Sequence, residues 1–129
     1  MPEYQNVVGE EWNSRLNKFL RVVLNWEQHG ISNTDIFCEN LKRKVGIDSV
    51  FSFRRNKVSR QQVVLVEAKT IEKIENLSRS KIENWIVDFQ EKIAYVPHSQ
   101  EFIEKFNTDE NADYQLGLLA LWVRDTNSY

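Results

Sequence analysis

Apolar and polar positions follow two different periods along the chain, and the change of period divides it into segments. Over residues 9–28 apolar side chains return every three or four positions, which predicts an amphipathic helix. Leu16, Leu20 and Val23 lie on its apolar side. Gly30 follows as a helix stop, because glycine adopts the left-handed conformation that commonly ends a helix.

Two segments in the middle of the chain have the composition of strands. Residues 46–54 and 61–69 are rich in β-branched and aromatic side chains, and the polar stretch 55–60 separates them, which predicts an antiparallel pair. The run Val63-Val64-Leu65-Val66 is apolar at consecutive positions, as in a strand covered on both faces. Residues 32–41 are ambiguous between an edge strand and a short helical turn.

The helical period returns after Thr70. An apolar stripe predicts a helix, and Pro97 limits how far it extends. The stripe consists of Ile82, Trp85, Ile86, Phe89 and Ile93. Ser99 is in a position to cap a short helix that follows.

Residues 114–123 form the last apolar run and predict a central strand, in which Gly117 and Ala120 would permit close helix packing. The order of elements is therefore helix, uncertain strand, strand, strand, helix, strand. This order predicts an α/β fold with a central mixed sheet flanked by helices. Residues 1–129 read as a single domain, either minimal or part of a longer protein.

Composition excludes several classes of protein. Apolar residues make up 41% of the chain and aromatic residues 12%, which excludes a disordered or low-complexity protein. Cys38 is the only cysteine and has no internal disulfide partner. The sequence shows neither an apolar signal segment nor a long apolar span, so we expect a cytoplasmic protein that is not inserted in a membrane.

The net charge of −2 counts against a general high-affinity DNA-binding protein, since such proteins are usually basic. Basic side chains nevertheless gather between the two predicted strands. They are Arg54, Arg55, Lys57 and Arg60. Such a loop is either a solvated hairpin tip or a surface that contacts phosphate groups, and the sequence leaves both interpretations open.

The candidate chemistry lies on the same two strands. Glu67-Ala68-Lys69 ends the apolar run, and Asp48 lies in the preceding strand. Side chains alternate along a strand, so Glu67 and Lys69 project from one face and Ala68 from the other. Two carboxylates and a lysine that meet at strand ends can hold a divalent cation and a water nucleophile, which is the chemistry of phosphodiester hydrolysis.

An aspartate followed on the next strand by Glu-x-Lys, with helices before and after, resembles the PD-(D/E)xK nuclease superfamily. The resemblance spans nearly the whole chain and implies a restriction-endonuclease-like core. Ile47 stands where the superfamily usually has proline. It implies that Asp48, Glu67 and the Ala68 carbonyl bind Mg²⁺ or Mn²⁺, while Lys69 positions or deprotonates the attacking water.

The same resemblance implies one more acidic residue from the first helix. Glu10 and Glu11 both qualify, and we favour Glu11. Gln90 matches in type a glutamine that some relatives place beside the site, although a surface glutamine fits it better. His29 and His98 have no partners at zinc-ligand spacing, so a zinc site is not expected.

The resulting hypothesis is a metal-dependent nuclease that cleaves DNA, with RNA also open, as an endonuclease in restriction, antiviral defence or repair. The alternative is a catalytically inactive form of the fold that binds nucleic acid or a protein partner. Assembly as a homodimer or with a partner subunit is open as well.

Overall fold

A mixed β-sheet with a separate hairpin forms the centre of the fold. The computed structural model describes residues 2–109 and 111–124, with the backbone alone for residues 2–9 and 76. The strands are β1 (Glu27–His29), β2 (Thr34–Cys38), β3 (Arg43–Ile47), β4 (Ser49–Phe53), β5 (Gln62–Ile71) and β6 (Asp113–Val123). Four of them form one sheet in the order β1-β4-β5-β6, and β2 pairs with β3. Because β4–β5 is antiparallel and β5–β6 is parallel, the sheet is mixed.

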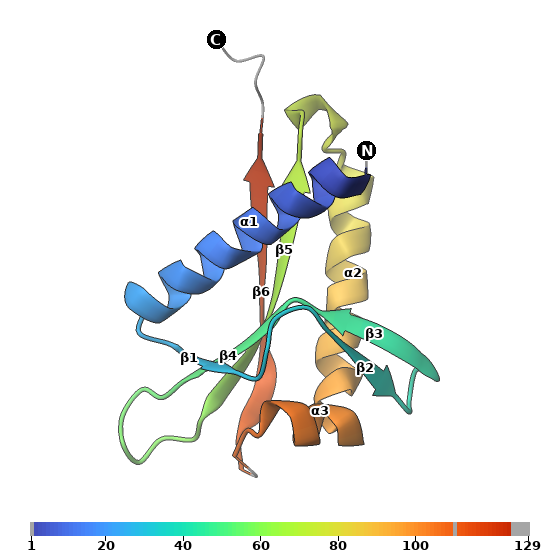
Figure 1. Ribbon diagram of the computed structural model, residues 1–129. Helices are drawn as coiled ribbons and strands as arrows, with labels where there is room; N and C mark the ends of the chain where they lie inside the picture. Colours follow the sequence, from blue (N-terminus) through green and yellow to red (C-terminus); the bar gives the residue numbers. More distant parts are fainter. Residues whose placement is uncertain (1, 110, 125–129) are drawn as a thin grey trace.

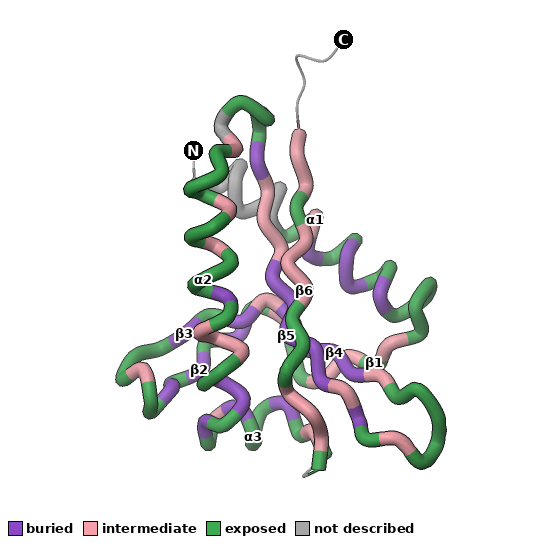
Figure 2. The backbone as a smooth tube through the Cα atoms, turned by 180° about the vertical axis from the view of Figure 1, so that it is seen from behind, coloured by how far each residue is buried: buried purple, intermediate pink, exposed green. Residues whose placement is uncertain are grey.

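Helices lie on both faces of this sheet. They are α1 (Pro2–Val22), α2 (Arg79–Tyr95) and α3 (Gln100–Phe106), with short 3₁₀ helices η1 (Ile74–Asn76) and η2 (Val96–His98). α1 crosses one face over β5 and β6, and α2 runs along the opposite face, as views from opposite sides show (Figures 1 and 2). The predicted α/β fold is thus confirmed. In the part of the chain that the structure describes, no helix is long and apolar enough to cross a membrane.

The consecutive apolar residues of β5 serve two hydrophobic cores. Val63 and Leu65 belong to the core that contains Phe89 of α2 and the buried aromatic residues of α3. Val64 and Val66 point the other way and belong to a core with Leu16 and Leu20 of α1. β5 is therefore covered on both faces, as its sequence predicts.

The structure decides between the two alternatives for residues 32–41 and corrects the interpretation of residues 46–54. Residues 32–41 contain a true strand, β2, antiparallel to β3. Residues 46–54 do not form one continuous strand, because the chain changes partner at Asp48. Up to Ile47 it pairs with β2, and from Ser49 it pairs with β5.

The first helix ends earlier than predicted, at Val22 rather than near Gln28. Asn25 adopts the left-handed conformation with φ 57°, and the Trp26 N–H returns to the Leu20 carbonyl at 3.0 Å. Asparagine tolerates this conformation better than most residues, so it ends the helix before Gly30 is reached. The following residues are then free to form β1.

The short helices after α2 follow their sequence signals. α2 gives way to η2, which contains Pro97, and the Ser99 hydroxyl accepts a hydrogen bond from the Phe102 N–H at 3.2 Å. The predicted cap of α3 is confirmed. This segment carries the chain to the start of β6.

β6 was predicted to be central, and this prediction is wrong. In the described sheet β6 is an edge strand that pairs with β5 alone. The apolar run that suggested a central position packs against helices instead, and Leu116 and Leu121 remain exposed. The predicted close packing at Gly117 is present, because a Cβ there would lie 2.4 Å from Ile93 Cδ1 and 2.8 Å from the Phe89 ring.

Replacing Gly117 with alanine should destabilise the protein by about 1 kcal/mol or more, because the added methyl group overpacks the contact with α2. Gly46→Ala is the matched control, since a Cβ there meets only Asp35 Oδ1, at 3.5 Å. Urea unfolding of both variants measures the difference. Equal stability of the two would contradict tight packing between α2 and β6.

Candidate active site

The change of strand partner at Asp48 brings its side chain to β5. Ser49 pairs with Val66 in the antiparallel ladder, so the preceding residue, Asp48, comes level with Glu67. The Asp48 carboxylate accepts a hydrogen bond through Oδ2 from the Ala68 N–H at 2.8 Å. The backbone of Asp48 is fixed as well, since its carbonyl accepts from the Asn33 N–H at 2.9 Å. The structure therefore brings Asp48 and the Glu67-Ala68-Lys69 segment together.

Glu67 is a buried carboxylate held between two lysines. Its residue is only 7% exposed. Lys69 Nζ lies 3.9 Å from Glu67 Oε2, on the same face of β5. Lys92, which comes from α2, forms an ion pair with Glu67 Oε1 and also donates to the Gly46 carbonyl at 3.0 Å. Two lysines and two carboxylates thus balance their charges.

An aromatic ring holds Lys69 from the other side. The Lys69 Nζ lies 5.7 Å from the centre of the Trp85 ring, within the range of a cation–π contact. Trp85 belongs to the apolar stripe of α2 and is half-buried. The lysine is therefore positioned between Glu67 and Trp85, with about a third of its side chain exposed.

Burial raises the pKa of the Asp48 carboxyl above 3.8, and the negative charge of Glu67 acts in the same direction. The Ala68 N–H, Lys92 and Lys69 oppose the rise in this pKa but do not cancel it. The ionised carboxylate is thus held in an unfavourable environment. Perturbed carboxyl groups of this kind are typical of functional sites.

The oxygen atoms of this site fit a hard divalent cation. Among the described residues no group of three or more His, Cys, Asp or Glu side chains gathers, so the acidic groups that a cation would find here are Asp48 and Glu67. The Ala68 N–H points toward Asp48, and the N–H and C=O of one strand residue face the same edge. Its carbonyl therefore opens toward Asp48. Mg²⁺ accepts such a set, because it retains several waters.

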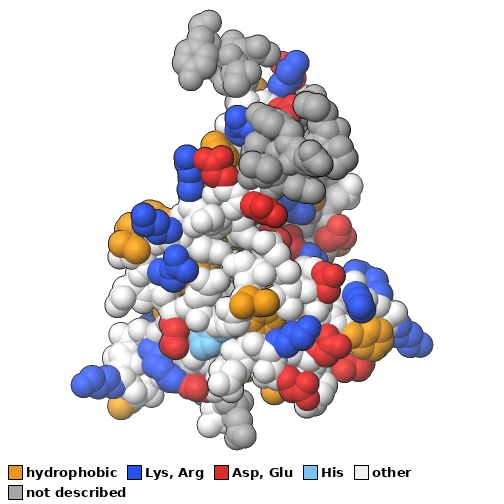
Figure 3. Space-filling view, in the orientation of Figure 1, with side chains coloured by type: hydrophobic (Ala, Val, Ile, Leu, Met, Phe, Trp, Pro, Cys, Tyr) orange, Lys and Arg blue, Asp and Glu red, His pale blue; other side chains and the backbone are white. Residues whose placement is uncertain are grey.

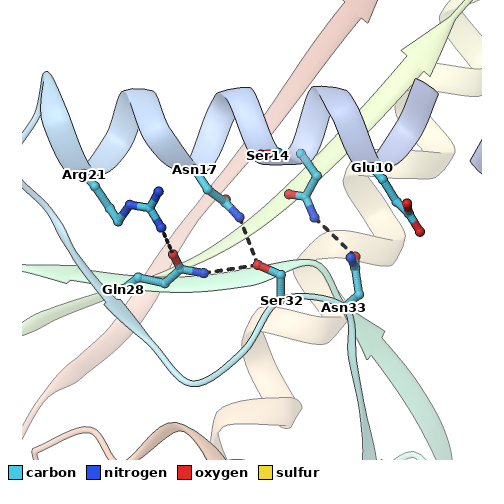
Figure 4. A pocket seen from close by; sticks show the side chains of 8 residues that line it. Glu10, Ser14, Asn17, Arg21, Gln28, Ser32 and Asn33 are labelled. Atoms are coloured by element: carbon cyan, nitrogen blue, oxygen red, sulfur yellow. Dashed lines mark hydrogen bonds between the residues drawn. The ribbon is translucent and has the colours of Figure 1, made fainter. Parts of the chain in front are cut away.

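Glu11 does not join this group. Its carboxylate forms an exposed ion pair with Arg15 at 2.7 Å, within α1. Glu10 lines a pocket together with Asn33 (Figure 4). The Asn33 N–H donates a hydrogen bond to the Asp48 carbonyl. A contribution of either glutamate to the site stays a prediction.

Lys92 is the residue that sequence analysis missed. It lies three positions after Phe89 and seven after Trp85, so it shares the helical face that packs against the sheet. In the sequence, the signal for its role is a lysine on the helix face that otherwise carries apolar residues. Gln90 is exposed and lines a separate pocket with His98 and Tyr114, which agrees with a surface glutamine.

The basic loop lies at the opposite end of the β4–β5 hairpin from Asp48 (Figure 1). Arg54 forms an ion pair with Asp109, and Arg60 lies 3.5 Å from Asp113. Arg55 and Lys57 are exposed. On the face shown in Figure 3, basic and acidic side chains are interspersed among the described residues. Nucleic-acid contact by this loop stays a prediction.

The mixed sheet with helices on both faces, and the meeting of Asp48 with Glu67 and Lys69, define the class of PD-(D/E)xK nuclease domains. The model of one family, the GAPS4 protein PD-(D/E)XK nuclease domain, matches residues 1–129. The chain therefore belongs to this family. No curated protein and no solved structure matches it significantly. PD-(D/E)xK nucleases generally use divalent metals.

Asp48→Asn should raise the melting temperature at neutral pH, because it removes a carboxylate whose pKa is raised by burial. The folded protein binds this proton more tightly than the unfolded chain, so wild-type stability falls as pH rises from 3.8 through the folded pKa. The gain should disappear below pH 3.8, where both states are protonated. Thermal unfolding across this pH range measures it.

Asp88→Asn is the matched control, since Asp88 is an exposed aspartate on α2. It should leave the melting temperature unchanged at each pH. An Asp48→Asn variant less stable than wild type at neutral pH would contradict the direction of the Asp48 pKa shift.

Proposed function

We propose that this domain is a metal-dependent nuclease that hydrolyses DNA phosphodiester bonds as an endonuclease. The observation that carries the proposal is the hydrogen bond between the Ala68 N–H and Asp48, which brings both carboxylates and Lys69 to one point. Asp48, Glu67 and the Ala68 carbonyl would hold the metal, which would be Mg²⁺ or Mn²⁺. Roles in restriction, antiviral defence or repair agree with the superfamily.

Each side chain has a chemical task in this proposal. A divalent cation bound there would acidify a water and neutralise the scissile phosphate. Lys69 orients the attacking water and offsets the negative charge that develops on the phosphate. Its contact with Trp85 keeps the ammonium group beside Glu67. The Ala68 N–H and Asn33 N–H fix Asp48 so that its oxygen atoms are preorganised.

Lys92 has a different task, because it forms an ion pair with Glu67 Oε1, whereas Lys69 lies 3.9 Å from Glu67 Oε2. Its ammonium group neutralises the buried carboxylate and competes for the oxygen atom Oε1. Lys92 therefore stabilises the metal-free protein and weakens its attraction for a cation.

Lys69→Ala should reduce DNA cleavage by at least about a hundredfold, the scale of a positioned proton-transfer or charge-stabilising group. Folding and Mn²⁺ binding should remain. Asp48→Asn and Glu67→Gln should lose both Mn²⁺ binding and cleavage. Cleavage of plasmid, single-stranded DNA and RNA with Mg²⁺, Mn²⁺ or EDTA, together with calorimetric Mn²⁺ titration, measures these effects.

Lys81→Ala is the control for Lys69, because the Lys81 Nζ also lies over the Trp85 ring, at 5.8 Å, but pairs with neither carboxylate. It should cut like wild type. If all three site variants cleave as well as Lys81→Ala, the proposed roles are wrong. Binding of nucleic acid without metal-dependent cleavage would support the catalytically inactive alternative.

Lys92→Met should destabilise the metal-free protein by about 3 kcal/mol, because it leaves the buried Glu67 carboxylate with Lys69 alone, 3.9 Å away, as its counter-charge. The same change should tighten Mn²⁺ binding, since Glu67 Oε1 loses its competing cation. The rise in melting temperature on adding Mn²⁺ should therefore exceed that of wild type. Weaker Mn²⁺ binding in Lys92→Met would show that the lysine orients Glu67 instead.

A further inference from the structure

A polar pocket lies between α1 and the segment that joins β1 to β2. Its volume is about 240 Å³, below the roughly 300–1,000 Å³ of pockets for drug-sized ligands. Side chains from both walls point toward one another across it (Figure 4). Its size suits one small ring system rather than an extended ligand.

The lining is mostly uncharged and carries paired donors and acceptors. Asn13, Asn17, Gln28 and Asn33 supply side-chain amides. Charged groups are one acid and one base, Glu10 and Arg21, and the Arg21 guanidinium already donates to Gln28 Oε1 at 2.9 Å. A phosphate-binding site would gather cations or backbone N–H groups. These amides instead match the edges of nucleobases.

One buried atom of the pocket lacks a partner. Asn13 is only 5% exposed, and its Nδ2 donates to Asn33 Oδ1 at 3.2 Å. Among the described residues no donor reaches Asn13 Oδ1. A buried acceptor without a partner costs about 1–3 kcal/mol. A ligand that satisfies it must therefore donate a hydrogen bond, which an ionised phosphate does not do.

The pocket wall is joined directly to the residues around Asp48. The Asn33 N–H bonds the Asp48 carbonyl at 2.9 Å, and the Ser49 hydroxyl donates to Asn17 Oδ1 at 2.9 Å. Glu10 lines the pocket beside Asn33. A strand whose phosphate lies at Asp48 would therefore have a neighbouring base within reach of these amides.

We propose that this pocket binds a single adenine or cytosine base of the nucleic-acid strand at the site. Both bases carry an amino group next to a ring nitrogen, so the amino group donates to Asn13 Oδ1 and the ring nitrogen accepts from an amide N–H. The proposal rests on the proposed nuclease function, in that the strand is its substrate. The pocket would give the domain a preference for sequence near the scissile bond.

The test compares bases that differ only in the amino group, with binding measured in EDTA so that no cleavage occurs. Fluorescence anisotropy would follow labelled single strands of adenine against unsubstituted purine, and of cytosine against 2-pyrimidinone. Wild type should bind at least one amino-bearing strand about tenfold tighter than its counterpart, the discrimination expected of one base-edge contact. A strand of abasic residues should bind no better than the counterparts.

Two variants connect this preference to the pocket. Asn13→Leu removes the acceptor at similar size, and Ser14→Phe fills the pocket from its exposed rim without removing any hydrogen bond of the buried network. In both variants the affinity for the amino-bearing strand should become about equal to that for its counterpart. Asn84→Leu, at an exposed asparagine of α2, should keep the preference. Thermal unfolding checks each variant, and Ser14→Phe decides the result if Asn13→Leu is unstable.

The pocket proposal would be overturned if wild type bound each amino-bearing strand no better than its counterpart. It would also be overturned if the preference for the amino-bearing strand persisted in Ser14→Phe. Cleavage of DNA with Mg²⁺, measured in parallel, tests the nuclease function by itself. Cleavage together with a ratio of one overturns the pocket alone. A tenfold ratio without any cleavage overturns the nuclease function and leaves the base-binding pocket.

Discussion

The hydrogen bond between the Ala68 N–H and the Asp48 carboxylate depends on a break in strand pairing. At Asp48 the chain leaves β2 and begins to pair with β5. A continuous ladder would have used the Ala68 N–H for a backbone bond. Because β4 begins only at Ser49, this N–H is free for a side chain, and Asp48 takes it. The local loss of sheet pairing thus creates the site.

The layers around β5 then determine what surrounds the carboxylates. Glu67 and Lys69 share the face that α2 covers, so Lys92 and Trp85 reach them from that helix. Ala68 points to the opposite face and packs in the core beneath α1. The parallel strand β6 allows α2 to lie this close, because Gly117 presents no side chain to Phe89 and Ile93. Close packing of α2 therefore brings its lysine to the site.

The helices and strands of this chain are easier to predict from its sequence than their boundaries and their places in the sheet. The antiparallel pair, the α2 stripe and the Ser99 cap depend on patterns among residues that are close in sequence, so the sequence alone predicts them. The edge position of β6 depends on which strands pair, and an apolar run covered by a helix looks the same as one between strands. The change of pairing partner at Asp48 could not be predicted, because the residues of β3 and β4 both have the composition of strands.

The same distinction explains the site. Asp48, Glu67 and Lys69 could be found because alternation and strand order place them together. Lys92 is distant in sequence and reaches Glu67 only through packing of α2, so its role required coordinates. The pairing of Glu11 with Arg15 on the exposed side of α1 depends on the rotation of that helix about its axis, which a spacing pattern leaves uncertain by a residue.

Charge balance joins stability to the proposed chemistry. A carboxylate as buried as Glu67 is costly unless a cation accompanies it, and Lys92 and Lys69 supply that cation in the protein alone. Asp48 has less support, as its raised pKa shows. The two carboxylates therefore differ: Glu67 is neutralised by lysines, while Asp48 retains an unfavourable charge. Under the proposed function, a divalent cation would offset this unfavourable charge most at Asp48, so the residue that lowers the stability of the protein alone would also be the one that favours metal binding.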